Sequence, residues 1–116
     1  MGLFIFIDDI FRFLLRLFRV WRAGRWPSAA GTIVRVVAVR VDYGWAPVLF
    51  YSFSVNSQEY FGDLHGTPGD EEEARKLASG IQPGGRIVVR YAPEDPTRTA
   101  ALNDDNRKSL PFTIDE

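Results

Sequence analysis

A chain of 116 residues has room for one domain with a modest core and a short appendage. Its formal net charge of -1 gives no indication of nucleic-acid binding. The absence of cysteine excludes disulfides, thiolate metal sites and thiol nucleophiles, and His65 is the single histidine. We therefore expect no catalytic residues, no metal site and no cofactor.

The first predicted element is an amphipathic helix over residues 3–23, which Gly24 ends. At about 100° per residue, the charged side chains share one arc of the helical wheel, and apolar side chains fill the wider remainder. The predicted membrane or partner contact face comprises Phe6, Ile7, Ile10, Phe13, Leu14, Leu17, Phe18 and Trp21. The predicted basic face comprises Arg12, Arg16, Arg19 and Arg22.

This helix is not expected to cross a bilayer. A spanning helix needs about 20 largely uncharged residues, whereas residues 3–23 include Asp8, Asp9 and four arginines. A central charge costs roughly 2.5–3.5 kcal/mol, against a gain of about 0.3–0.6 kcal/mol for each Leu, Ile, Phe or Val. Three locations remain open for the apolar face: the membrane interface, another protein subunit, or the chain's own β domain.

The next segment, residues 31–44, alternates apolar and polar side chains, but the phase of the alternation changes along it. Val34 and Val36 belong to one alternation, and Val37 and Val39 belong to the next. A β-bulge near Val36-Val37 would let both sets point into a core, and it would bend the strand sharply.

A β-hairpin is predicted to follow, with strands over residues 47–55 and 58–63 and a two-residue turn at Asn56-Ser57. The first of these strands is expected to turn one face inward, formed by Leu49, Tyr51, Phe53 and Val55.

A short helix and two strands complete the pattern. Asp70 and Glu73 have the spacing of a capping box, and Gly80 ends the predicted helix. Residues 83–96 and 97–102 then predict the last two strands. The first of these is expected to turn Ile87, Val89 and Tyr91 inward.

The predicted fold is therefore mainly β with an N-terminal amphipathic α-helix. The order β-β-β-α-β-β, with a bent first strand, is typical of a small five-stranded antiparallel OB-like barrel. The tail is polar apart from Leu110, Phe112 and Ile114, and we expect it to be loose. The predicted division is a docking helix (1–25), a β-barrel domain (26–102) and a C-terminal tail (103–116).

Side chains in the barrel segment do not predict catalysis. His65 has Asp63 two residues away, but one His and one Asp match no metal-ligand spacing. The acidic run 70–73 is explained by the start of a helix. Five aromatic residues could stack nucleic-acid bases on an OB-like barrel, but their alternation favours packing in the core. These are Phe50, Tyr51, Phe53, Tyr60 and Phe61.

Three stretches follow one another in a specific order: WPSAAGTIV, PVLFYSFSVNSQEYFGD and PGGRIVVRYAPEDPTRTAAL. Between Trp26 and Leu102 this pattern resembles the DUF3592 family. Its members are small prokaryotic proteins of unknown function, usually attached to the membrane by hydrophobic helices around one β-rich domain. The matching positions are Trp26, Pro27, Gly31, Pro47, Tyr51, Tyr60, Gly62, Gly84, Val89, Tyr91, Pro93, Asp95 and Pro96.

The chain departs from that pattern at two places. Ala92 stands where the family often has an acidic residue before the proline. A charged amphipathic helix stands where relatives commonly have a spanning one. The resemblance therefore implies a membrane-associated β domain, and it implies no activity.

These observations favour a non-catalytic, membrane-peripheral protein, an accessory or structural subunit of a larger membrane assembly anchored by its N-terminal helix. We expect it at the cytoplasmic face of a prokaryotic inner membrane, with the membrane surface and protein subunits as partners. Neither nucleic acid nor a small-molecule substrate is expected. The alternative is a soluble OB-like module that binds a ligand or nucleic acid and self-associates through the helix.

Overall fold

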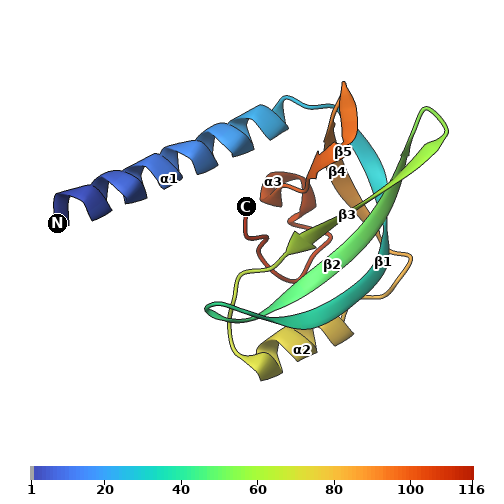
Figure 1. The fold of residues 1–116 in the computed structure, drawn as a ribbon. Helices are drawn as coiled ribbons and strands as arrows, with labels where there is room; N and C mark the ends of the chain where they lie inside the picture. Colours follow the sequence, from blue (N-terminus) through green and yellow to red (C-terminus); the bar gives the residue numbers. More distant parts are fainter. Residues whose placement is uncertain (1) are drawn as a thin grey trace.

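The computed structural model describes residues 2–116 (Figure 1). Within the first helix, the side chains of residues 2–9, 16, 19 and 20 lie outside this description. In chain order the elements are α1 (Gly2–Gly24), β1 (Ser28–Val41), β2 (Gly44–Val55), β3 (Gln58–His65), α2 (Glu71–Ser79), β4 (Arg86–Ala92), β5 (Asp95–Ala100) and α3 (Asn103–Asn106).

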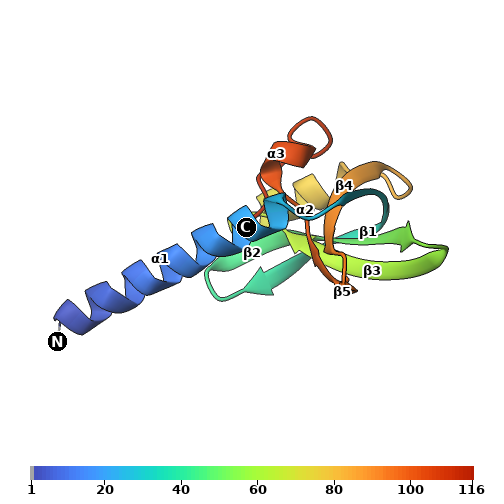
Figure 2. The same ribbon diagram turned by 90° about the horizontal axis from the view of Figure 1, so that it is seen from above.

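The strands curl into a barrel from which α1 projects (Figure 2). Over residues 2–116, five antiparallel strands form one sheet in the order β3-β2-β1-β4-β5. The long strand β1 pairs with β4 along its first part and with β2 along its second. Because β3 and β5 then lie against each other, the barrel is nearly closed. The predicted mainly β, five-stranded OB-like fold with the order β-β-β-α-β-β is confirmed.

The change of phase in β1 is caused by a bulge at Val34. The register with β2 shifts between Ile33 and Arg35, so the predicted bulge exists but lies before Val36. Val34 is 50% exposed and Val39 is 38% exposed, so the expectation that both point inward is wrong. The extra residue of a bulge has no cross-strand partner, and here Ile33 and Val36 pack against the core instead.

The hairpin between β2 and β3 is formed as predicted. Its turn residues Asn56 and Ser57 have φ angles of 53° and 68°, and a type I′ turn requires a positive φ at both positions. The core cluster contains the predicted inward residues of β2 and β4, with Val55 and Tyr91 at its margin. The fully buried members are Leu49, Tyr51, Phe53, Ile87 and Val89.

The barrel closes along a line between β3 and β5, which we call the seam. The Tyr51 hydroxyl group reaches across it and forms a 2.7 Å hydrogen bond with Thr99 Oγ1. Gly62 of β3 lies next to this hydrogen bond. A Cβ atom at position 62 would lie 2.6 Å from the Tyr51 hydroxyl oxygen and 2.8 Å from Thr99 Oγ1. Glycine therefore allows the two strands to approach.

The helix α2 begins and ends where its sequence predicts. The Asp70 carboxylate accepts a 2.7 Å hydrogen bond from the Glu73 N–H, which caps the helix, and Gly80 follows the last turn. Ala74 and Ala78 are buried, and the helix packs on β1 and β2.

The C-terminal tail, residues 103–116, completes the barrel. Leu110 and Ile114 belong to the core cluster, and the Asp115 N–H donates to the carbonyl oxygen of His65 at 2.8 Å. The expectation of a loose tail is therefore wrong. A few apolar side chains are enough to order it because they enter a core that the strands leave open.

A short helix within this tail, α3, was not predicted. Its last residue, Asn106, has a polar side chain that is fully buried, at 1% exposure. The carboxamide oxygen accepts from the Val88 N–H at 2.8 Å, and the nitrogen donates to the carbonyl oxygens of Val88 and Leu102, each at 3.0 Å. Asn106 therefore attaches the tail to β4 at Val88, before the residues of β4 that pair with β5.

Candidate interaction surface

The helix α1 presents apolar side chains to solvent along most of its length. Its described apolar side chains between residues 10 and 21 are 43–60% exposed. The helix meets the barrel at its C-terminal end, where Ala23 is buried (Figure 1). The chain's own β domain does not cover this face. The exposed residues predicted for contact are Ile10, Phe13, Leu14, Leu17, Phe18 and Trp21, whereas Phe6 and Ile7 lie outside the described side chains.

Phe11 and Leu15 are equally exposed, and the helical wheel did not include them in the contact face. On the wheel both fall beside the arginines, so periodicity placed them with the polar arc. Their apolar character was the signal that could have identified them. The apolar surface of α1 is therefore wider than predicted.

The base of α1 is held to the barrel by backbone groups. Arg90 Nη1 donates to the carbonyl oxygen of Trp26 at 2.9 Å, and the Tyr91 N–H donates to the carbonyl oxygen of Pro27 at 3.2 Å. The small side chain of Ala23 is buried at the same place. These contacts attach the end of α1 to β4.

Arg90 is itself held by Asp105 of α3. Its Nε donates to Asp105 Oδ2 at 2.9 Å and its Nη2 donates to Oδ1 at 3.0 Å, a bidentate pair with both side chains largely buried. The hydrogen bonds from Arg90 lower the pKa of Asp105, and the same bonds raise the pKa of Arg90. Both groups are therefore charged at neutral pH.

Part of the predicted basic face of α1 lies toward the C-terminal tail. Arg12 and Arg22 line a groove of about 670 Å³ between the helix and the C-terminal tail, whereas the side chains of Arg16 and Arg19 lie outside the description. We call this the helix groove. Its lining residues are Arg12, Leu15, Phe18, Arg22, Trp26, Arg98, Asp115 and Glu116.

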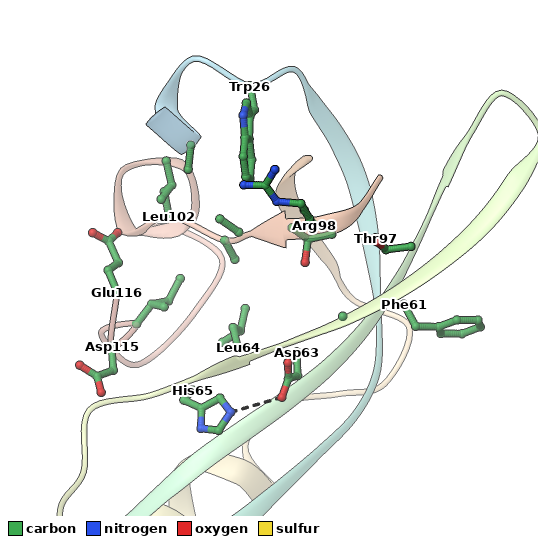
Figure 3. A pocket seen from close by; sticks show the side chains of 16 residues that line it. Trp26, Phe61, Asp63, Leu64, His65, Thr97, Arg98, Leu102, Asp115 and Glu116 are labelled. Atoms are coloured by element: carbon green, nitrogen blue, oxygen red, sulfur yellow. Dashed lines mark hydrogen bonds and ion pairs between the residues drawn. The ribbon is translucent and has the colours of Figure 1, made fainter. Parts of the chain in front are cut away.

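A cleft of about 760 Å³ adjoins the helix groove at the seam, between β3, β5, the tail and the end of α1 (Figure 3). Trp26 and Arg98 lie against each other on one side, with the guanidinium 5.6 Å from the ring centroid. On the other side, His65 Nε2 lies 3.2 Å from Asp63 Oδ2. Phe61 points away from the centre of the cleft. The seam cleft and the helix groove share Trp26, Arg98, Asp115 and Glu116.

The five aromatic residues of β2 and β3 divide between the core and the outside. Tyr51 and Phe53 are buried and Tyr60 packs beside them, while Phe50 and Phe61 are exposed. Burial is the main cause that raises the pKa of the Tyr51 hydroxyl, although its hydrogen bond with Thr99 opposes the shift. Tyr51 is thus a neutral structural group at physiological pH.

The described residues also bear on metal binding and on membrane crossing. In this part of the chain, no three His, Asp or Glu side chains gather closely enough to hold a metal ion. Across the same residues, no helix combines the length and the apolar character that crossing a bilayer requires.

A comparison with protein families identifies the barrel. The model of a domain of unknown function (DUF3592) matches residues 29–106, which include most of β1 and all of β2 to β5. No curated protein and no solved structure gives a significant match to the chain. Because the family match extends over more than half of its residues, the chain belongs to the DUF3592 family.

Proposed function

We propose that this protein is a non-catalytic, membrane-peripheral accessory subunit that attaches to the membrane surface through α1. The observation that carries the proposal is the exposure of the helix: its described apolar side chains from residue 10 to 21 stay 43–60% exposed. Contiguous apolar patches of this kind are rare on monomeric proteins and mark binding surfaces. The seam and the core are complete without them.

The chemistry of α1 fits the boundary between head groups and acyl chains. Burying one Leu or Phe side chain fully contributes about 1.5–3 kcal/mol, so several together outweigh the loss of helix mobility. Trp21 lies near the end of the helix with the Arg25 guanidinium 4.4 Å from its ring centroid. Aromatic rings with a charged neighbour are typical of interfacial helices.

The distribution of charge supports the cytoplasmic side of a membrane. Residues 1–25 contain five arginines and two aspartates, a formal charge of +3, whereas the remaining residues contain nine basic and thirteen acidic side chains, a formal charge of -4. An anionic leaflet attracts the helix and repels the barrel. This segregation favours a pose with α1 on the lipid and the barrel in the aqueous phase.

Flotation with lipid vesicles tests the proposal. The full chain is expected to float with vesicles, and Leu14→Ser with Leu17→Ser is expected to leave it at the bottom of the gradient with an unchanged circular dichroism spectrum. The matched control, Phe61→Ser with Phe50→Ser, removes two exposed aromatic groups from the barrel and is expected to float like the wild type.

Other outcomes would identify other functions. If the double serine variant floats fully, α1 is not the attachment element. If the wild type does not bind vesicles but forms a dimer that the serine variant cannot form, α1 mediates self-association. Retention on single-stranded nucleic acid that falls steeply with salt would favour the alternative of an OB-like nucleic-acid module.

A further inference from the structure

We propose that the helix groove is a binding site for a zwitterionic phosphoethanolamine lipid head group. This inference rests on the proposed attachment of α1 to a membrane and names the lipid that the attached protein recognises. It starts from the place of the groove on the side of α1 that carries Arg12 and Arg22, where Leu15 and Phe18 at the margin of the exposed apolar surface also line it.

The depth of the groove follows from the geometry of an interfacial helix. Such a helix buries its apolar face about 5–10 Å into the boundary between head groups and acyl chains. Its diameter with side chains is about 10–12 Å, so the opposite face lies among the head groups. The helix groove lies at that level, between α1 and the C-terminal tail.

Two of the arginines that line the groove lie near the base of the helix. Arg22 of α1 and Arg98 of β5 both line it, together with the Trp26 ring on which Arg98 stacks. Among the described residues, Arg22 has no ion pair, and Arg98 has a long one of 3.8 Å to Glu94. Guanidinium groups bind phosphate oxygens through charge-assisted hydrogen bonds. These two therefore take the phosphate group.

The opposite wall carries negative charge from the tail. Asp115 and Glu116 line the groove facing α1, and the Glu116 Oε1 accepts a hydrogen bond from the Asn103 N–H. A carboxylate has acceptor capacity for several donors. A simple anion would be repelled here, whereas a primary ammonium group beside the phosphate is attracted. Leu15 and Phe18 supply an apolar wall for the start of the acyl chains.

This combination distinguishes between common head groups. Phosphoethanolamine offers both a phosphate and an ammonium that donates hydrogen bonds. Phosphocholine has a quaternary ammonium without N–H donors, and phosphoglycerol has no cation for the carboxylates. The preference for phosphoethanolamine should be about fivefold to tenfold, which is what one or two exposed charge pairs supply.

The test measures partition of the full chain onto vesicles of phosphatidylcholine alone and onto vesicles that also contain a second lipid. The second lipid is phosphatidylethanolamine, phosphatidylglycerol or diacylglycerol, each at the same fraction. Diacylglycerol reproduces the packing defects of phosphatidylethanolamine without its head group. The expected result is stronger binding with phosphatidylethanolamine than with phosphatidylcholine alone or with diacylglycerol, whereas phosphatidylglycerol attracts α1 through its net charge. Arg22→Gln with Arg98→Gln should abolish that preference, while the control Arg75→Gln on α2 should keep it.

Each contrary result has its own meaning. Equal gains from diacylglycerol and phosphatidylethanolamine, or an unchanged preference in the double glutamine variant, would overturn the head-group site and leave attachment by α1 intact. If the chain binds none of these vesicles, the proposed function fails. The head-group site is then tested separately by adding soluble O-phosphoethanolamine to the chain. Shifts of the Trp26 indole resonance with that compound but not with phosphocholine would support it, and no shift would overturn it.

Discussion

At the scale of single residues, Gly62 sets how closely the seam can close. A Cβ atom there would lie within 2.8 Å of both the Tyr51 hydroxyl oxygen and Thr99 Oγ1. Gly62→Ala should therefore destabilise the fold by about 1–3 kcal/mol, the usual cost of forcing extra atoms into a packed site. Urea unfolding measures the change. Gly24→Ala is the matched control because a Cβ there meets nothing within 4 Å; equal stability of the two variants would contradict this account.

The bulge in β1 gives a second contrast between neighbouring residues. Val34→Asp should cost less than about 1 kcal/mol, since its side chain is half exposed. Ile33→Asp should cost several kcal/mol because it would bury an unpaired charge. Thermal unfolding monitored by circular dichroism compares the two. Severe damage by aspartate at Val34 would place this side chain in the core after all.

Local chemistry explains which residue-scale predictions were right. The cap of Asp70 and the turn at Asn56-Ser57 depend on a few neighbouring residues, so the sequence was enough to place them. The bulge depends on the register between two strands. Its existence could be read from the change of phase, but its position at Val34 is decided by the cross-strand pairing with β2.

At the scale of elements, the C-terminal tail belongs to the folding unit. A fragment of residues 26–116, without α1, should unfold cooperatively in urea. A fragment of residues 26–102 should not, because it lacks Leu110, Ile114 and the buried Asn106. Within the longer fragment, Leu110→Ala should cost about 2–5 kcal/mol. Cooperative unfolding of the 26–102 fragment would mean that the barrel folds without the tail.

The pair that connects β4 with α3 should make stability depend on pH. Hydrogen bonds from Arg90 lower the pKa of Asp105 in the folded chain. The pair therefore contributes its full stability above the pKa of an unfolded aspartate, about 3.9. This stability is lost as the pH falls through the lower pKa of the folded chain. Asp105→Asn should destabilise the protein by about 1–3 kcal/mol at neutral pH and make the loss of stability in acid shallower.

Urea titrations at neutral and acidic pH measure both effects. Asp104→Asn is the control, because that carboxylate is highly exposed and its ion pair among the described residues is with nearby Arg107. Some acid dependence should remain in the Asp105→Asn variant, since hydrogen bonds from Thr97 also lower the pKa of Asp95. An unchanged acid profile would show that the Arg90 pair does not contribute to it.

Elements with strong periodicity were predicted, and elements fixed by distant contacts were not. The strands and α2 carry their own alternation and end signals. The tail places two of its apolar residues, Leu110 and Ile114, in the core, and nothing nearby in its polar sequence shows which cavity they fill. The direction of α1 depends on Arg90 holding the Trp26 carbonyl, a contact across 64 positions of the chain.

At the scale of the whole molecule, apolar burial and charge contribute differently to attachment. Each arginine at an anionic surface adds only about 1 kcal/mol, and salt screens it. Replacing Arg12 and Arg16 by Gln should therefore weaken binding to anionic vesicles at low salt and change little at high salt. Vesicle partition at two salt concentrations measures this. Loss of the wild-type protein from vesicles in a high-salt wash would make attachment mainly electrostatic.

The place of the tail in the core also has a consequence during synthesis. Ribosomes add about 5–20 residues per second, so about 5–20 seconds pass between the emergence of Phe18 and that of Leu110. The barrel cannot complete its interior before then, whereas α1 can form within microseconds. The apolar surface of α1 is therefore available to a bilayer or a chaperone while the rest of the chain is still being synthesised. Targeting would precede folding, and the barrel would form on a chain already tethered.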